Sequence, residues 1–233
     1  MSRTAVIHQP DFLPHLGFFD RLLHADVLVL LDNAQYVDST SRSWTHRDKI
    51  KTPRGAQWIS LSVKSAPRDT PICQIELAQE VDWRANNINL LRENYRKAPY
   101  FAEIFPEIEQ LYAWPSTRLS DFNRASIELL LRLLDIRIEI LTATHLAPCG
   151  KNNELLVDIL KKIGADRYLS GPGARAYFRP EPFSEAGIEV LWQDFRHPVY
   201  FQLHGDFVPY LSSIDLLLNC GIDQSRKILR NNR

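Results

Sequence analysis

The sequence predicts an α/β protein with an open, mostly parallel sheet, helices on both faces and a helical insert in the middle third. Short β-branched and apolar runs alternate with segments of helical spacing near both ends of the chain, whereas residues 82–134 carry only helical spacing. A chain of 233 residues with 45% hydrophobic side chains can bury a substantial core. We expect one domain over residues 1–233, Rossmann-like in its sheet, with residues 82–134 as a helical subdomain or insert.

The first elements place a loop at a ligand-binding edge. Thr4–His8 and Val27–Leu31 are buried-strand runs, and Leu16–His24 between them has apolar residues on one helical face. A strand, a helix and a second strand form a right-handed crossover between parallel strands. The loop Gln9–His15 therefore lies at the carboxyl end of the first strand, where open α/β sheets bind ligands.

The remaining elements follow from the same periodicities and from Pro and Gly punctuation. Residues Asp38–Arg54 are expected to form a polar loop, and Ala56–Val63 an extended segment. The other expected helices are Trp83–Arg96, Phe101–Tyr112, Ser120–Leu134, Asn153–Ile163 and Tyr210–Asn219, and the other expected strands are Arg137–Leu141, Arg167–Ser170 and Ile188–Trp192.

Composition excludes several classes of protein. The 28 basic and 28 acidic side chains balance, so no global charge attracts DNA or anionic lipid, and neither partner is expected. No run approaches the length of a membrane span or signal peptide, which predicts a cytoplasmic protein. Three widely spaced cysteines without a CxxC pair argue against a disulfide framework and a zinc site, and no spacing typical of another metal site is visible.

The densest candidate site is the loop that follows the first strand. Pro10 and Pro14 stiffen it, and a stiff backbone positions polar side chains for binding. We expect His8 to be catalytic and Gln9 and His15 to bind substrate. The spacing only partly matches the HxGH-type signatures of nucleotide-transferring enzymes, and a core histidine bonded to a backbone carbonyl is the simpler alternative for His8.

A carboxylate follows the second strand. Asp32 would face the same crevice as His8, and a carboxylate beside an imidazole orients it and raises its pKa. The pair would then serve as a general base, with Gln35 and Tyr36 nearby as binding residues. The alternative is that Asp32 only caps the following turn.

Aromatic residues interleave with a basic stretch further on. Trp44 and His46 alternate with cations that would bind phosphate or carboxylate, although charge runs are often only a solvated face. The cations are Arg42, Arg47, Lys49, Lys51 and Arg54, of which Arg47, Lys49 and Lys51 are the expected phosphate ligands.

The second half of the chain offers a thiol and two glycine turns. Cys149 precedes a helix, where its pKa would be depressed, so it is either a nucleophile or a small packing residue. Backbone amides at these turns would cradle an anion or a carbonyl oxygen. The binding candidates here are Lys151, Asn152, Ser170, Gly171 and Gly173.

A late loop rich in aromatic and titratable groups would close a pocket, with His197 and Asp206 as binding candidates. A well-packed surface corner is the alternative.

Taken together, the motifs resemble the WbqC-like protein family over essentially the whole chain. The matching motifs are His8-Gln9-Pro10, Gly17-Phe18-Phe19, Gln35-Tyr36, Ile50-Lys51, Gly150-Lys151, Gly164-Ala165-Asp166, Tyr168-Leu169-Ser170-Gly171 and Pro209-Tyr210-Leu211-Ser212. The chain departs from the family pattern at His15, His46 and Asp48, so we expect its substrate choice to differ from that of its relatives.

The resemblance implies a role in O-antigen or other surface-polysaccharide biosynthesis, or in secondary metabolism. Some relatives carry the label glycine transferase, which implies amide formation from an aminoacyl donor. We therefore expect a transferase of acyl or aminoacyl groups to an amine, with His8 as general base. A nucleotide-dependent nucleotidyl or glycosyl transfer, and a non-catalytic ligand-binding subunit, stay open. So do a phosphate-bearing donor (acyl-carrier phosphopantetheine, coenzyme A or a nucleotide), an acyl carrier protein as partner, and a homo-oligomer.

Overall fold

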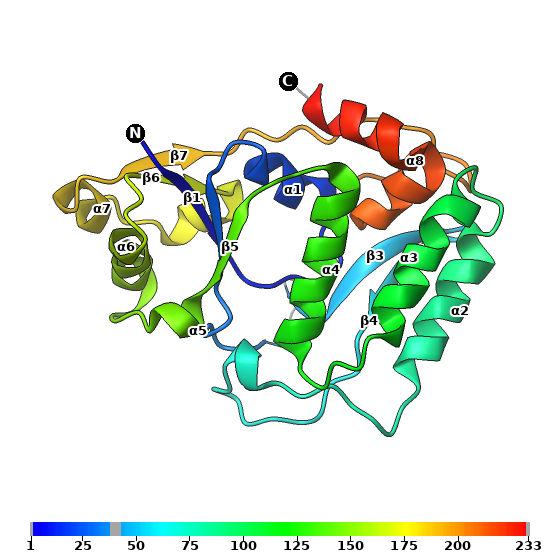
Figure 1. Cartoon of the computed structure of the whole chain (residues 1–233), viewed down its shortest axis with the longest axis horizontal. Coiled ribbons are helices and arrows are strands. Elements are labelled where there is room, and N and C mark those ends of the chain that lie inside the picture. Colours follow the sequence, from blue (N-terminus) through cyan, green and yellow to red (C-terminus); the bar gives the residue numbers. More distant parts are fainter. Residues whose placement is uncertain (1, 38–42, 232–233) are drawn as a thin grey trace.

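A five-stranded parallel sheet organises the protein (Figure 1). The computed structural model describes residues 2–37 and 43–231. Every pairing in this sheet is parallel, which confirms the predicted α/β class and the open parallel sheet. Its strands, in spatial order, are β5 (Glu139–Thr142), β2 (Val27–Leu30), β1 (Thr4–His8), β6 (Arg167–Ser170) and β7 (Glu189–Trp192).

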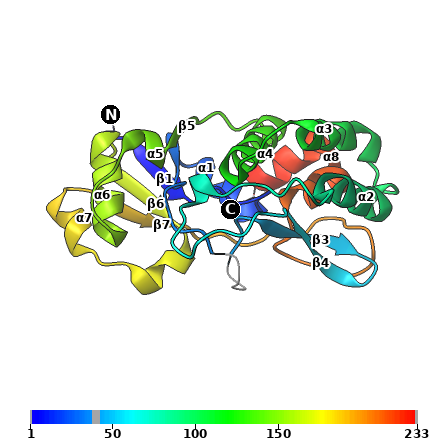
Figure 2. The same cartoon turned by 90° about the horizontal axis from the view of Figure 1, so that it is seen from below.

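Alternating side chains of the central strands feed two cores, one on each face of the sheet. In β1, Val6 belongs to the larger core, and Ala5 and Ile7 belong to the smaller one. The larger core also takes in α1 (Leu16–Leu22), α4 (Leu119–Leu134) and α8 (Ser213–Arg230), and the smaller takes in α5 (Ala143–Leu146), α6 (Asn152–Lys162) and α7 (Glu181–Glu185). Figure 2 shows these two groups of helices on opposite sides of the strands.

A β-hairpin occupies part of the segment that we expected to be a polar loop. Strand β3 (Arg47–Thr52) pairs antiparallel with β4 (Gly55–Ser60). The loop prediction is therefore wrong for β3, whereas β4 agrees with the extended segment predicted at Ala56–Val63. Residues 38–42 of that segment lie outside the described residues. The charged side chains of β3 are held on Trp58, with the Arg47 guanidinium 4.3 Å and the Lys49 ammonium 4.8 Å from its ring.

The predicted helical insert consists of α2 (Trp83–Tyr95), α3 (Phe101–Ala113) and α4, which lie on the hairpin side of the sheet (Figures 1 and 2). Their apolar side chains join those of α1 and α8 in the larger core. Two short 3₁₀ helices, η1 (Ile72–Gln74) and η2 (Pro172–Tyr177), complete the described elements.

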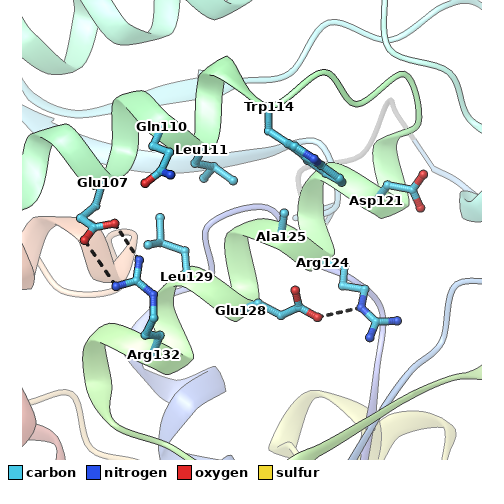
Figure 3. Close-up of a pocket in the computed structure, with 10 residues that line it drawn as sticks. All are labelled: Glu107, Gln110, Leu111, Trp114, Asp121, Arg124, Ala125, Glu128, Leu129 and Arg132. Carbon is cyan, nitrogen blue, oxygen red and sulfur yellow. Dashed lines mark hydrogen bonds and ion pairs between the residues drawn. The ribbon is translucent and has the colours of Figure 1, made fainter.

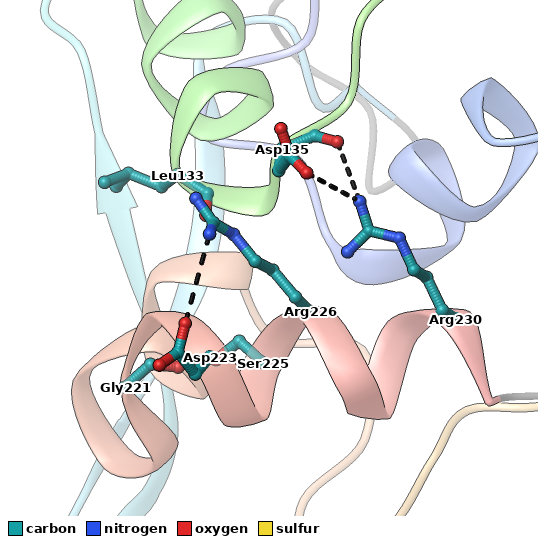
Figure 4. Close-up of polar contacts among 7 residues, drawn as sticks. All are labelled: Leu133, Asp135, Gly221, Asp223, Ser225, Arg226 and Arg230. Carbon is teal, nitrogen blue, oxygen red and sulfur yellow. Dashed lines mark hydrogen bonds and ion pairs between the residues drawn. The ribbon is translucent and has the colours of Figure 1, made fainter.

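The last helix is longer than the predicted Tyr210–Asn219. Gly221 looked like a stop signal, but it adopts φ 73° inside α8, and the helix resumes after this kink. The second half is tied to the end of α4, because Arg226 Nε donates to the Leu133 carbonyl at 2.9 Å and Arg230 to the Asp135 carbonyl at 2.7 Å (Figure 4). These tertiary contacts extend the helix beyond the glycine.

The strand order creates a topological switch beside β1. The chain winds from β1 through β2 to β5 in one direction, and β6 and β7 lie on the other side of β1. Ligands of open α/β sheets bind in the crevice outside the carboxyl ends of the strands at such a point. The carboxyl ends of β1 and β6 therefore define where to look for a site.

Candidate functional site

A cavity of about 390 Å³ opens at this point between the ends of β1 and β6. We call it the switch-point cavity. It brings together five of the residues singled out from the sequence, which are His8, His15, Ser170, Gly171 and Gly173. Arg21, Tyr168, Gln193, Phe195 and Tyr210 also line it.

His8 ends β1 and offers one ring nitrogen to a ligand. Its Nδ1 lies 2.9 Å from the Gln9 carbonyl oxygen, which can only accept, so Nδ1 carries the proton. Burial, and next the positive charge of Arg21, lower the pKa of His8 from 6.5 to about 3. The imidazole is therefore neutral, and its Nε2 has a free lone pair.

His15 has the opposite tautomer. It is the N-cap of α1, and its Nδ1 accepts from the Gly17 amide at 3.0 Å, so in the neutral ring Nε2 carries the proton. Burial, followed by Arg21 and His197, lowers the pKa of His15 to about 4. A Cβ on Gly17 would lie 2.6 Å from His15 Cε1, which explains the glycine.

Asp11 supplies the carboxyl group nearest to His8. Its Oδ2 lies 3.5 Å from His8 Nδ1, and burial raises the pKa of Asp11 from 3.8 to about 7. At neutral pH the aspartate is about half protonated beside a neutral imidazole. Sequence reasoning missed this role, although Asp11 stands at i+3 from His8 in the same proline-bounded loop.

Arg21 is the buried cation of the cavity and was also missed. It is 7% exposed, and its Nε has no hydrogen-bond partner in the described chain. A Cβ on Gly171 would lie 3.1 Å from Arg21 Nη1, so the glycine leaves room for the guanidinium. The sequence offered one indication, the helical spacing: Arg21 stands four residues after Gly17, so the two lie on the same face of α1.

Asp32 does not pair with His8, and that prediction is wrong. Its Oδ1 accepts from the Thr144 amide at 2.9 Å, and it lines a separate cavity of about 220 Å³ with Cys73 and His145. The alternative, capping, is the observed role, although the capped segment is α5 rather than the following turn. The physical reason is that the first amides of a helix have no partner within the helix, and the Asp32 carboxylate accepts from one of them.

A second cavity of about 790 Å³ adjoins the first, and we call it the flanking cavity. The two share Tyr168, Ser170 and Ala174 as lining residues. Among the predicted binding residues it is lined by Gln9, Gln35, Asn152 and Ser170.

Lys51 of the basic hairpin is not available to bind a phosphate. That side chain is 1% exposed, and its Nζ donates to the carbonyls of Gly205 and Asp206, so its predicted ligand role is wrong. Lys49 lies 5.7 Å from the ring of Trp44, which in turn is 6.5 Å from the ring of His15. Trp44, which precedes the hairpin, contacts the cavity residue His15, but neither Trp44 nor the hairpin cations line the switch-point cavity.

The other candidates lie outside the two cavities. His46 packs edge to face on Tyr36 at 5.8 Å, and Arg47 also contacts Trp58, while Arg42 lies outside the described residues. His197 Nδ1 donates to the Pro198 carbonyl at 2.9 Å, and its ring lies 5.1 Å from that of Tyr210.

Asp206 and Lys151 are exposed, and neither lines the cavities described above. Cys149 is also exposed, with its amide bonded to Asp158 at 2.8 Å. It lines neither the switch-point cavity nor the flanking cavity.

A further hollow, of about 830 Å³, is a groove between α3 and α4 (Figure 3). Four of its charges form two pairs, Arg132 with Glu107 at 2.6 Å and Arg124 with Glu128 at 2.8 Å. Its lining residues belong to α3, to α4 and to Trp114 at the end of α3, so no strand end contributes to it.

Neither a membrane-spanning helix nor a metal-binding cluster is present among the described residues. No helix among residues 2–37 and 43–231 is long and apolar enough to cross a membrane. Within the same ranges, no group of three or more His, Cys, Asp or Glu side chains is arranged to hold a metal ion.

Comparison with known proteins supports one family. The family model for the WbqC-like protein family matches residues 9–227. The uncharacterized protein Rv1507c of Mycobacterium tuberculosis is 32% identical over 225 residues, which cover 96% of each chain. No solved structure shows significant similarity.

Proposed function

This chain belongs to the WbqC-like protein family, and from that premise we propose that it is a transferase that moves an acyl or aminoacyl group from an activated donor to an amine. Some relatives carry the label glycine transferase, so a glycyl donor belongs in any test of this protein. One observation carries the proposal: two neutral histidines with opposite tautomers line the same cavity.

His8 is the general base of this proposal. The attacking amine forms a bond from its nitrogen to the donor carbonyl carbon and gives up a proton to His8 Nε2. Asp11, ionised, would stabilise the resulting imidazolium through its position 3.5 Å from Nδ1. The carboxylate role that we first assigned to Asp32 therefore belongs to Asp11.

His15 is the electrophilic partner. Its Nε2–H would donate to the carbonyl oxygen as that oxygen becomes negative in the tetrahedral intermediate. When the intermediate collapses, the bond to the leaving group breaks, and the proton on His8 passes to that group. Backbone amides near Gly171 and Gly173, which line the cavity, are further candidates to receive the oxyanion.

The flanking cavity is the proposed donor site. Its volume of about 790 Å³ lies in the range of small-molecule pockets, and shared Ser170 connects it to the histidines. Phosphopantetheine on an acyl carrier protein, coenzyme A and a nucleotide are the donor carriers to test. The acceptor would be an amino sugar or small metabolite of surface-polysaccharide or secondary-metabolite biosynthesis, in the cytoplasm.

A two-step experiment tests the proposal. Thermal shift with nucleotides, coenzyme A, aminoacyl donors including glycyl donors, and sugar nucleotides identifies the donor class, because a ligand of the folded state raises Tm. Amide formation is then followed by mass spectrometry with that donor and a panel of amines. Turnover that falls at least about 100-fold in His8→Gln, but not in the exposed-site control His24→Gln, supports the proposal.

Two outcomes would overturn it. Tight binding with no turnover would favour a non-catalytic ligand-binding subunit. Transfer of a nucleotidyl or glycosyl group, seen as a different mass increment, would favour nucleotide-dependent chemistry.

A further inference from the structure

Arg21 places a cation in the switch-point cavity, where its guanidinium carbon lies 6.0 Å from the Phe18 ring and no carboxylate of the described residues is paired with it. The side chain is 7% exposed, and within the described ranges it forms no ion pair, while its Nε has no hydrogen-bond acceptor. Removing a guanidinium from water without pairing it with a carboxylate destabilises a folded protein. A negatively charged group of a bound ligand would pair with the guanidinium and offset this destabilisation.

The surroundings keep the guanidinium accessible from the cavity. Arg21 lies on α1, whose N-cap is His15. Its Nη1 is close to Gly171, which has no side chain to cover the guanidinium. Both Arg21 and Gly171 line the cavity with His8 and His15.

Charge balance sets the class of ligand. The carboxyls whose fields reach Arg21 are those of Asp11 and Asp20. Burial raises the pKa of both carboxyls, that of Asp11 to about 7, which reduces the negative charge that they set against the guanidinium. At most one positive charge is left over, which matches a single negative charge.

We propose that Arg21 is the anion subsite of the cavity and binds a singly charged oxyanion of the substrate, a carboxylate or a phosphodiester, through its planar fork. Two parallel N–H donors match two oxygens of such a group. This inference deepens the proposed function and rests on it for the identity of the reaction, but the binding itself is measured without turnover.

Binding of an anion at Arg21 would also make His8 a stronger base. The positive charge of Arg21 is one cause of the low pKa of both His8 and His15. An oxyanion bound to the guanidinium offsets that charge, so the titration midpoints of both histidines rise when the anion binds. The general base becomes stronger only in the loaded cavity.

Direct binding is tested with acetate, dimethyl phosphate and inorganic phosphate, monitored by histidine resonances in NMR titrations at constant ionic strength. Acetate or dimethyl phosphate should move the His8 and His15 signals with saturation, and inorganic phosphate, mostly a dianion above neutral pH, should bind more weakly. A response to acetate alone identifies a carboxylate, and a response to dimethyl phosphate alone identifies a phosphodiester. Equal or tighter binding of the dianion would overturn the charge argument.

Variants locate the binding. Arg21→Gln should weaken anion binding at least about tenfold, whereas Arg132→Gln, which removes the same charge from the α3–α4 groove, should leave it unchanged. Equal effects of the two would overturn the proposal.

A second pair covers the case in which Arg21→Gln does not fold. Gly171→Ala should shift the guanidinium slightly, because the new Cβ would lie 3.1 Å from Nη1, whereas Gly173→Ala adds the same methyl where no heavy atom lies within 4 Å. The proposal requires a larger loss of affinity for Gly171→Ala than for Gly173→Ala, and equal losses contradict it. Anion binding without transfer of any acyl group would sink the proposed function alone, and transfer without anion binding would sink only the subsite.

Discussion

The Nδ1 atoms of His8 and His15 play opposite roles: the first donates to the Gln9 carbonyl, and the second accepts from the Gly17 amide. Both rings line one cavity, so a lone pair and an N–H are offered to the same ligand. This division of roles is set by the backbone of the loop between β1 and α1, since both partners are main-chain groups.

Gly17→Ala should damage the site without unfolding the protein. The new Cβ would lie 2.6 Å from His15 Cε1 and 3.0 Å from Phe195 Cδ1, so the imidazole must leave its cap position. Turnover should fall roughly 100-fold, the usual cost of one oxyanion donor. Steady-state kinetics with thermal unfolding as the folding control checks this, and parent-level turnover would show that His15 placement is irrelevant.

His8 should make the protein sensitive to acid. The pKa of His8 is lowered from 6.5 to about 3, so the unfolded chain takes up a proton below pH 6.5 that the folded chain refuses until near pH 3. Its stabilising contribution is complete above pH 6.5 and is lost as the pH falls, with a slope of up to about 1.4 kcal/mol per pH unit. His8→Asn should remove that slope from the free energy of unfolding measured by urea titration.

Asp11→Asn provides the comparison of opposite sign. Because the pKa of Asp11 is raised from 3.8 to about 7, its contribution is complete below pH 3.8 and is lost as the pH rises toward 7. A pH-independent difference between the parent and either variant would contradict the assignment of that group.

Cys149→Ala should retain parent turnover. The thiol is exposed and lines neither cavity at the ends of β1 and β6, so the covalent route that we considered from the sequence has no support from its position. The test is a kinetic comparison under the saturating donor, together with intact-mass analysis during turnover. An acyl adduct that maps to Cys149 and a dead alanine variant would restore the covalent route.

Asp215→Ala should cost about 3–5 kcal/mol of stability. The carboxylate is fully buried and accepts from Tyr95 Oη at 2.7 Å, Tyr200 Oη at 2.9 Å and Gln202 Nε2 at 2.8 Å. Its removal leaves three buried donors without their acceptor. Asp223→Ala on the same helix, where the side chain is 92% exposed, should stay within about 0.5 kcal/mol of the parent in chemical denaturation. Equal losses would mean that the network is not stabilising.

The sheet could be predicted because its signals are local. β1 and β2 are short apolar runs joined by one amphipathic helix, and the ligand-binding edge then follows from chain topology. The hairpin at β3 could not, because its charged residues are stabilised by Trp58, a contact made only after folding.

The site was predicted in part for a similar reason. His8 and His15 stand in one rigid loop, so proximity in sequence implied proximity in space. Asp32 comes shortly after Leu30, the register partner of His8, which suggested that Asp32 and His8 share a crevice. Its carboxylate nevertheless accepts from the Thr144 amide. Arg21 resembled the polar face of an ordinary helix, and only the packing of α1 against the β6 loop reveals a buried cation.

The most direct measurement is the long-range ¹H–¹⁵N correlation spectrum of the histidine side chains at neutral pH, with signals assigned by His8→Gln and His15→Gln. We expect two neutral rings, His8 protonated on Nδ1 and His15 protonated on Nε2. The same tautomer on both rings, or a charged imidazolium at either position, would contradict the complementary base and donor roles.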